Sequence, residues 1–143
     1  MTKVWMFFVV LAVAFVAVSL AIDCPPTPIT PAPADIDPNQ VNYMLLCVKR
    51  VVEGRTASAI LSACDPDSDP FRFRLLQAPP SMGIAITSSE TAIYWPAAEL
   101  GVWYVDVEVY DIPTDPNESL TDRGTIVFVV RPANKPPVFG GCR

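Results

Sequence analysis

The chain has 143 residues, of which 15 are acidic and 10 basic, so its formal net charge is −5 at pH 7. Nucleic acids bind clustered Lys and Arg, and an acidic chain without such a cluster predicts no nucleic-acid partner. Histidine is absent, which removes the commonest general base and the commonest zinc ligand. The four cysteines contain no C-x-x-C pair, so neither a thiolate metal site nor a thioredoxin-like motif is indicated.

The N-terminus has the pattern of an export signal. Lys3 is followed by an uncharged apolar run over residues 4–22, and Ser19-Leu20-Ala21 places small residues at the −3 and −1 positions of a cleavage site. We therefore expect residues 1–21 to be a signal peptide and the protein to be secreted, extracellular or at the cell surface. The alternative is an uncleaved anchor, since the run is about long enough to cross a bilayer. The membrane is a partner only in that case.

Residues 22–40 form a proline-rich segment, with six prolines between positions 24 and 39. Proline interrupts helices and inner strands, so this segment is predicted to be an extended, semi-rigid stalk. The composition changes at Val41, where apolar and β-branched residues begin. We expect one domain over residues 41–139, followed by a short tail at residues 140–143.

The domain contains seven apolar runs separated by turn residues. We expect strands over residues 43–52, 57–64, 71–76, 83–87, 91–95, 102–110 and 125–130. No convincing helical period follows the N-terminal run. The predicted fold is therefore all-β: an Ig-like Greek-key sandwich of about seven strands.

Alternation along two of these strands predicts which face of each is buried. Residues 102–110 present Trp103 and three valines on one side and polar side chains on the other. In residues 71–76, two arginines alternate with Phe and Leu. If the two strands are neighbours, Arg72 and Arg74 can pair with Asp106 and Glu108, as exposed ion pairs of at most about 1 kcal/mol each. The run 125–130 is apolar on both faces, which predicts a strand inside a sheet or under a covering segment.

The cysteines suggest disulfides, because an exported chain meets an oxidising environment. Residues 43–52 and 57–64 are separated by a turn at residues 53–56, and a hairpin there would bring Cys47 opposite Cys64. We expect a Cys47–Cys64 bridge, with Cys24–Cys142 closing the ends of the domain. The alternative is that Cys47 and Cys64 are buried and reduced.

The run Asp65-Pro66-Asp67-Ser68-Asp69-Pro70 places three carboxylates close together. Neighbouring carboxylates repel unless a cation lies between them. Ca²⁺ takes six to eight oxygen ligands, which alternating Asp side chains on a bent loop can supply. The alternative is a solvated turn, since Asp, Pro and Ser all favour turns.

Further motifs follow in a fixed order: Leu75-Leu76-Gln77-Ala78-Pro79-Pro80-Ser81-Met82, Ile93-Tyr94-Trp95-Pro96, Gly101-Val102-Trp103-Tyr104-Val105, Val109-Tyr110-Asp111 and Asn134-Lys135-Pro136-Pro137-Val138-Phe139. Together with the Asp run, this order resembles a cadherin-like, dystroglycan-type Ig repeat, a "putative Ig" module of exported, mainly bacterial, proteins. The resemblance extends over residues 41–139. The chain departs from the family in having a single repeat and four cysteines.

The resemblance implies a Ca²⁺ site where the loop between the second and third strands meets the end of the sixth strand. Its ligands would be the residues that match the family's acidic positions: Asp65, Asp67, Asp69, Asp111 and Glu53. In cadherins the preceding linker completes the cage. The linker positions here, which match the pattern more loosely, are Asp35, Asp37 and Asn39.

Two functions remain open at this stage. The first is a non-enzymatic adhesion or structural module, stabilised by Ca²⁺ at the junction of stalk and domain. Its partners would be other extracellular or cell-surface proteins, or further copies of itself joined head to tail or cross-linked through Cys24 and Cys142. The second is a small secreted glycan- or protein-binding module with no essential Ca²⁺, in which Tyr104 and Tyr110 would be the residues to test. No nucleophile with a base partner is present, so catalysis is not expected.

Overall fold

The computed structural model describes residues 19–22 and 35–135. Within these ranges it contains eight strands and two short 3-10 helices. The strands are β1 (Ser19–Ile22), β2 (Met44–Val52), β3 (Ala57–Cys64), β4 (Phe71–Gln77), β5 (Gly83–Ile86), β6 (Thr91–Trp95), β7 (Gly101–Asp111) and β8 (Thr121–Arg131). The helices are η1 (Pro38–Gln40) and η2 (Pro116–Glu118).

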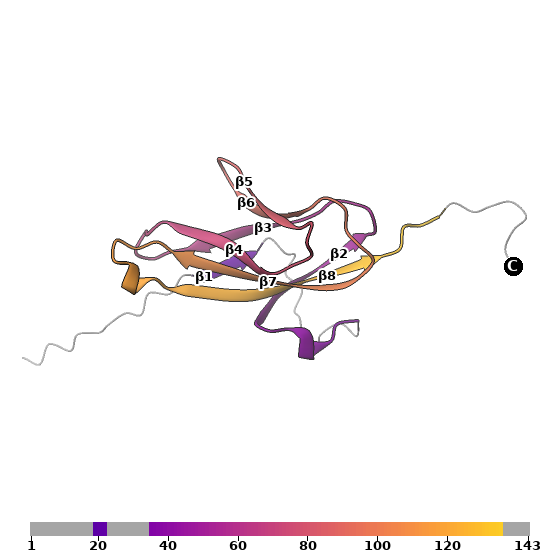
Figure 1. The fold of residues 1–143 in the computed structure, drawn as a ribbon, viewed down its shortest axis with the longest axis horizontal. Helices are drawn as coiled ribbons and strands as arrows, with labels where there is room; N and C mark the ends of the chain where they lie inside the picture. The colour runs from indigo at the N-terminus through magenta and orange to yellow at the C-terminus, as the bar shows by residue number, and fades with distance from the viewer. Residues whose placement is uncertain (1–18, 23–34, 136–143) are drawn as a thin grey trace, which may run out of the picture.

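The strands form two packed sheets (Figure 1). Sheet A has the order β1-β3-β6-β5, and sheet B has the order β2-β8-β7-β4. The pairings are antiparallel except that of β2 with β8, which is parallel. The all-β Ig-like sandwich predicted from the sequence is confirmed.

The core between the sheets is built from the alternating residues of the central strands. Val105, Val107 and Val109 of β7 point inward and are fully buried, as the alternation predicted. Trp95 at the end of β6 is also fully buried, and its ring meets that of Phe128 edge to face at 6.0 Å between centroids. Side chains of alternate residues therefore fill the space between the layers.

The other side of β7 and β8 is covered by the segment that precedes β2. Ile36 is buried there against Tyr104 and Val127, and the backbone N–H of Asp37 donates to the Tyr104 hydroxyl at 2.7 Å. In Figure 1 this indigo-to-purple segment lies on the side of β7 and β8 away from β3. The run at 125–130 is thus apolar on both faces because β8 is covered on both. The described end of the predicted stalk, residues 35–40, packs on the domain.

The expected hairpin between residues 43–52 and 57–64 is wrong. β2 belongs to sheet B and β3 to sheet A, so these strands do not pair. β2 instead lies beside β8 from Met44 to Val52, with an irregularity in the register between Leu45 and Cys47.

The expected Cys47–Cys64 bridge is wrong for the same reason. Cys64 lies on the outward side of β3, exposed, with a free thiol. Cys47 is only 3% exposed and points into the core from β2. Cys47 is disulfide-bonded, and its partner is not among the described residues. The positions of Cys24 and Cys142 also lie outside the described residues.

Strand β1 coincides with the end of the apolar N-terminal run. Ser19 pairs with Cys64 and Ile22 with Leu61, which places β1 at the edge of sheet A. The predicted cleavage after Ala21 falls within this strand, and it stays a prediction. Among the described residues, no helix has the length and apolar character needed to cross a membrane.

Candidate functional site

Three of the predicted acidic ligands converge at one end of the sandwich. Asp65 follows β3, Asp69 precedes β4, and Asp111 ends β7. One carboxylate oxygen from each lies within 4.8 Å of those of the other two. We call these three residues the acidic cluster. Asp65 follows a strand of sheet A, whereas Asp69 precedes one strand of sheet B and Asp111 ends another, so the cluster lies where the two sheets meet.

A tight turn brings Asp65 and Asp69 together. The Asp67 backbone N–H donates to Oδ1 of Asp65 at 2.8 Å, and the Ser68 N–H donates to the Asp65 carbonyl at 3.0 Å. Ser68 takes a φ of 63°, in the left-handed region. This turn reverses the chain between the two sheets and leaves Asp67 exposed on its outer side.

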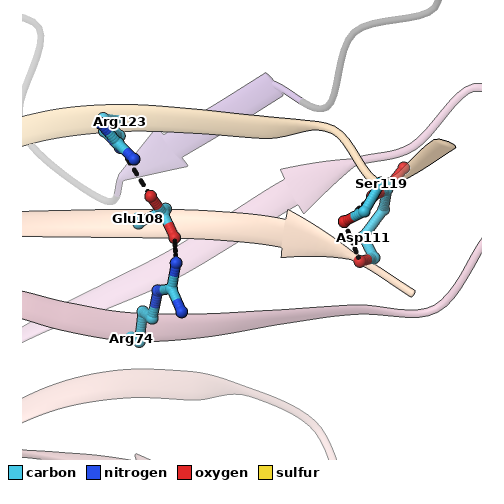
Figure 2. Close-up of polar contacts among 5 residues, drawn as sticks. All are labelled: Arg74, Glu108, Asp111, Ser119 and Arg123. Carbon is cyan, nitrogen blue, oxygen red and sulfur yellow. Dashed lines mark hydrogen bonds and ion pairs between the residues drawn. The ribbon is translucent and has the colours of Figure 1, made fainter. Parts of the chain in front are cut away.

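Asp111 is held in place by the loop that leads into β8. Its Oδ1 accepts a hydrogen bond from the Ser119 hydroxyl at 3.0 Å (Figure 2). The same oxygen accepts a second hydrogen bond from the Leu120 backbone N–H at 2.6 Å. Both donors bind Oδ1, so Oδ2 is the oxygen left for another partner. Ser119 was not predicted as part of the site, since a lone Ser in a polar loop carries no signal of which carboxylate it will meet.

The electrostatics of the acidic cluster are unfavourable without a cation. Desolvation raises the pKa of Asp69, and the negative charges of Asp65, Asp111, Asp67 and Glu118 raise it further. Oδ2 of Asp65 is buried and has no hydrogen-bond partner among the described residues. A buried carboxylate oxygen without a donor is costly, and it marks the place where a cation would be stabilising.

The geometry fits Ca²⁺. Oxygens that share one Ca²⁺ lie about 2.4 Å from it, so no two of them are more than about 5 Å apart. The 4.8 Å limit on the three carboxylate oxygens satisfies that condition. Waters and backbone carbonyls would supply the remaining ligands, as they commonly do for this ion.

The structure does not bring the other predicted ligands to this place. The Glu53 backbone N–H bonds the Arg131 carbonyl, at the far end of β8, roughly 30 Å along the strand from the cluster. Asp35 forms an ion pair with Arg50 at 2.6 Å. Asp37 caps η1, and its Oδ1 accepts from the backbone and side-chain nitrogens of Asn39. These contacts hold residues 35–40 on sheet B, away from the acidic cluster.

A row of charged side chains crosses the outer face of sheet B beside the cluster. Glu108 of β7 lies between Arg74 of β4 and Arg123 of β8, and each arginine binds one of its carboxylate oxygens (Figure 2). The Arg74 guanidinium stacks over the Tyr110 ring at 5.1 Å, and that of Arg123 over Tyr43 at 5.6 Å. We call Arg74, Glu108 and Arg123 the ionic row.

The ionic row confirms one predicted pair and corrects the rest. Arg74 pairs with Glu108 as expected, but Glu108 is fully buried rather than exposed. Arg72 lies opposite Tyr110 in the register, not near Asp106. Asp106 instead accepts from Thr125 at 2.7 Å and from Asn42 at 2.7 Å. The sequence pattern did not indicate these partners, because they depend on β8 and the start of the domain lying beside β7.

Glu108 and Asp106 both use their carboxylates in ion pairs or hydrogen bonds within the domain. Desolvation raises the pKa of Glu108, but hydrogen bonds and positive charge from Arg123 and Arg74 outweigh it and lower the pKa overall. A general acid needs a raised pKa, so Glu108 is unsuited to that role. Tyr104 is only 9% exposed and its hydroxyl is bonded to Asp37, which removes it as a surface ligand-binding residue.

No family model matches the chain, and no curated protein matches it. Among solved structures, it is similar to the titin M3 domain, with 12% identity over 63% of this chain and 93% of that one, at a TM-score of 0.39. It is also similar to titin domains Z1Z2 in complex with telethonin, with 17% identity over 71% of this chain and 51% of that one, at a TM-score of 0.40.

A third similar structure is an endo-fucoidan hydrolase of glycoside hydrolase family 107, with 16% identity over 76% of this chain and a TM-score of 0.49. The chain spans only 16% of the length of that hydrolase.

Proposed function

We propose that this protein is an exported, non-enzymatic adhesion or structural module whose acidic cluster binds Ca²⁺. The observation that carries the proposal is the convergence of Asp65, Asp69 and Asp111, together with a buried Asp65 oxygen that has no described hydrogen-bond partner. The order of sequence motifs that resembles cadherin-like repeats supports the same ion. The proposed partners are other extracellular or cell-surface proteins, or further copies of this chain.

In this proposal Ca²⁺ joins the two sheets at one end of the sandwich. Asp65 follows a strand of sheet A, while Asp69 and Asp111 flank strands of sheet B. A cation bound by all three would neutralise their repulsion and fix the turn at residues 65–69 against the end of β7. The module would then present a rigid end to whatever precedes or follows it.

The alternative is a glycan- or protein-binding module in which the cluster has no essential ion. The exposed arginines of sheet B favour it, because arginine and tyrosine are enriched where proteins bind partners. The two functions differ in whether stability and assembly depend on Ca²⁺.

Thermal unfolding of the exported protein, with excess EDTA and then with millimolar Ca²⁺, tests the proposal. An ion that binds only the folded state stabilises it by about 2.7 kcal/mol at a hundredfold excess over Kd, so Tm should rise by on the order of 10 °C. Asp69→Asn should abolish the rise. Asp67→Asn is the matched control: it makes the same charge change on the same turn, but outside the cluster, and should keep the rise. An equal Tm in EDTA and Ca²⁺ would refute the proposed ion site.

The Ca²⁺ effect should also depend on pH. The pKa of Asp69 in the folded protein is raised above the usual 3.8. In the metal-free protein, ionisation of Asp69 therefore lowers the stability of the folded state as the pH rises above 3.8. Ca²⁺ requires the ionised form, and protons compete with it. The difference in Tm between Ca²⁺ and EDTA should therefore be full at pH 7 and shrink as the pH falls towards about 4. Calorimetry over this range checks it; a difference independent of pH would mean that the ion binds elsewhere.

A further inference from the structure

Strand β4 is an edge of sheet B. In the described part of the chain it pairs with β7 on one side, and no strand pairs with its other side. An edge strand presents backbone N–H and C=O groups to which a further strand can pair. Two features of β4 show what kind of strand would fit.

The outer face of β4 is basic. Arg72 and Arg74 lie on this face, and the Arg74 side chain is 56% exposed although it binds Glu108. Stacking on Tyr110 and pairing with Glu108 restrict the motion of the Arg74 guanidinium. The guanidinium has five N–H donors, so it can still donate to a further acceptor. Carboxylates bind such forks in two-pronged geometry. A strand added at this edge would place its outward side chains beside both arginines.

The inner side of the same edge opens into a groove of about 340 Å³. Phe71 and Phe73 of β4 form one wall, with their rings edge to face at 5.8 Å. Leu61 and Ala63 of β3 form part of the opposite wall. Phe71 is 37% exposed, so this edge has apolar surface that an added strand could cover. The inward side chains of such a strand would enter the groove.

We propose that the β4 edge binds an extended segment of a partner protein in which acidic residues occupy every second position and apolar residues lie between them. Its backbone extends sheet B, its acidic side chains bind Arg72 and Arg74, and its apolar side chains fill the groove. Binding by strand addition draws affinity from the main chain and specificity from alternate side chains. Pairing of β4 with β4 of a second copy is disfavoured, because arginines of like charge would face each other across the pair.

The probe is a nine-residue peptide in which Glu alternates with Val or Thr, titrated into the ¹⁵N-labelled full chain in both Ca²⁺ and EDTA. We expect saturable binding, with the amide shifts concentrated in β4. Arg72→Glu should weaken binding at least about tenfold through charge repulsion, and should favour the matching peptide with Lys in place of Glu. Arg72 lies outside the ionic row, so this change leaves the Glu108 pairs in place.

Arg55→Glu, in the exposed turn between β2 and β3, makes the same change in net charge and should bind like the unmodified protein. Two further peptides carry N-methyl groups on alternate backbone amides, one on the odd and one on the even positions. The peptide whose methylated amides would face β4 should not bind. The proposal is overturned if about 1 mM peptide, the weak end of specific binding, gives no saturable shifts. It is also overturned if Arg72→Glu and Arg55→Glu behave alike, or if the shifts lie on other strands. If the peptide still binds in EDTA, the β4 site functions without Ca²⁺, and its outcome is independent of the proposed Ca²⁺ site.

Discussion

Glu108→Gln is expected to lower the free energy of unfolding by about 3 kcal/mol, because it removes the charge from a fully buried carboxylate that two arginines bind. Glutamine keeps the size of the side chain but has one acceptor oxygen where glutamate has two. Arg74 and Arg123 then compete for that oxygen, and the three strands that they join lose a connection. Urea unfolding of the two proteins measures the difference.

The pH dependence provides an internal check on this prediction. The pKa of Glu108 is lowered from the usual 4.5, so its contribution to stability is present above that pH. It is lost as the pH falls through the depressed value of the folded state. The difference in stability between Glu108→Gln and the unmodified protein should therefore narrow in acid. A loss below about 1 kcal/mol at pH 7, the range of exposed pairs, would mean that the ionic row is no stronger than a surface contact.

Trp95→Ala should have the largest effect of any single change in the described core, at about 4 kcal/mol. The side chain is fully buried and meets Trp103 and Phe128 edge to face at 5.6 and 6.0 Å. Its indole N–H also donates to the Ser81 hydroxyl at 2.9 Å, so the deletion leaves a cavity and removes this hydrogen bond. Since domains are stable by only 5–15 kcal/mol, this variant should be close to unfolding at 37 °C.

Trp95→Phe is the matched control for Trp95→Ala. It keeps an aromatic ring in the core and removes the indole N–H, so it should cost clearly less. Circular dichroism melts of both variants make the comparison. Equal losses would show that the hydrogen bond to Ser81, rather than the filled volume, carries the effect.

The strands could be predicted because their residues alternate with a period of two. Along β7 the inward valines and the outward polar residues follow this period without a break, so the strand and its core-facing side were predicted correctly, although the opposite face is also buried. Pairing of strands is not encoded in the same way. An apolar run such as Leu45 to Val52 fits beside any neighbour, and the turn after it suggested β3 when its partner is β8, some 80 residues later in the chain.

The candidate site was predicted in part, and the limits have a physical cause. Asp65, Asp69 and Asp111 converge, since a turn and a strand end place them together. Asp67 lies between two of them in sequence, but the turn uses its backbone N–H and leaves its side chain exposed. Glu53 was assigned through the family resemblance, but it lies beside Arg131 at the other end of the sandwich. Glu108 is bound by arginines from the two neighbouring strands, β4 and β8, which no local pattern in β7 records.

The parallel pairing of β2 with β8 has a mechanical consequence. The chain enters β2 beside Gly124 and leaves β8 beside Val52, so the two connections to the rest of the protein lie at opposite ends of the same ladder (Figure 1). Tension between these ends runs along the strands and across their hydrogen bonds. The bonds of the ladder then share the load and must break together, whereas a hairpin pulled from its open end would give way one bond at a time.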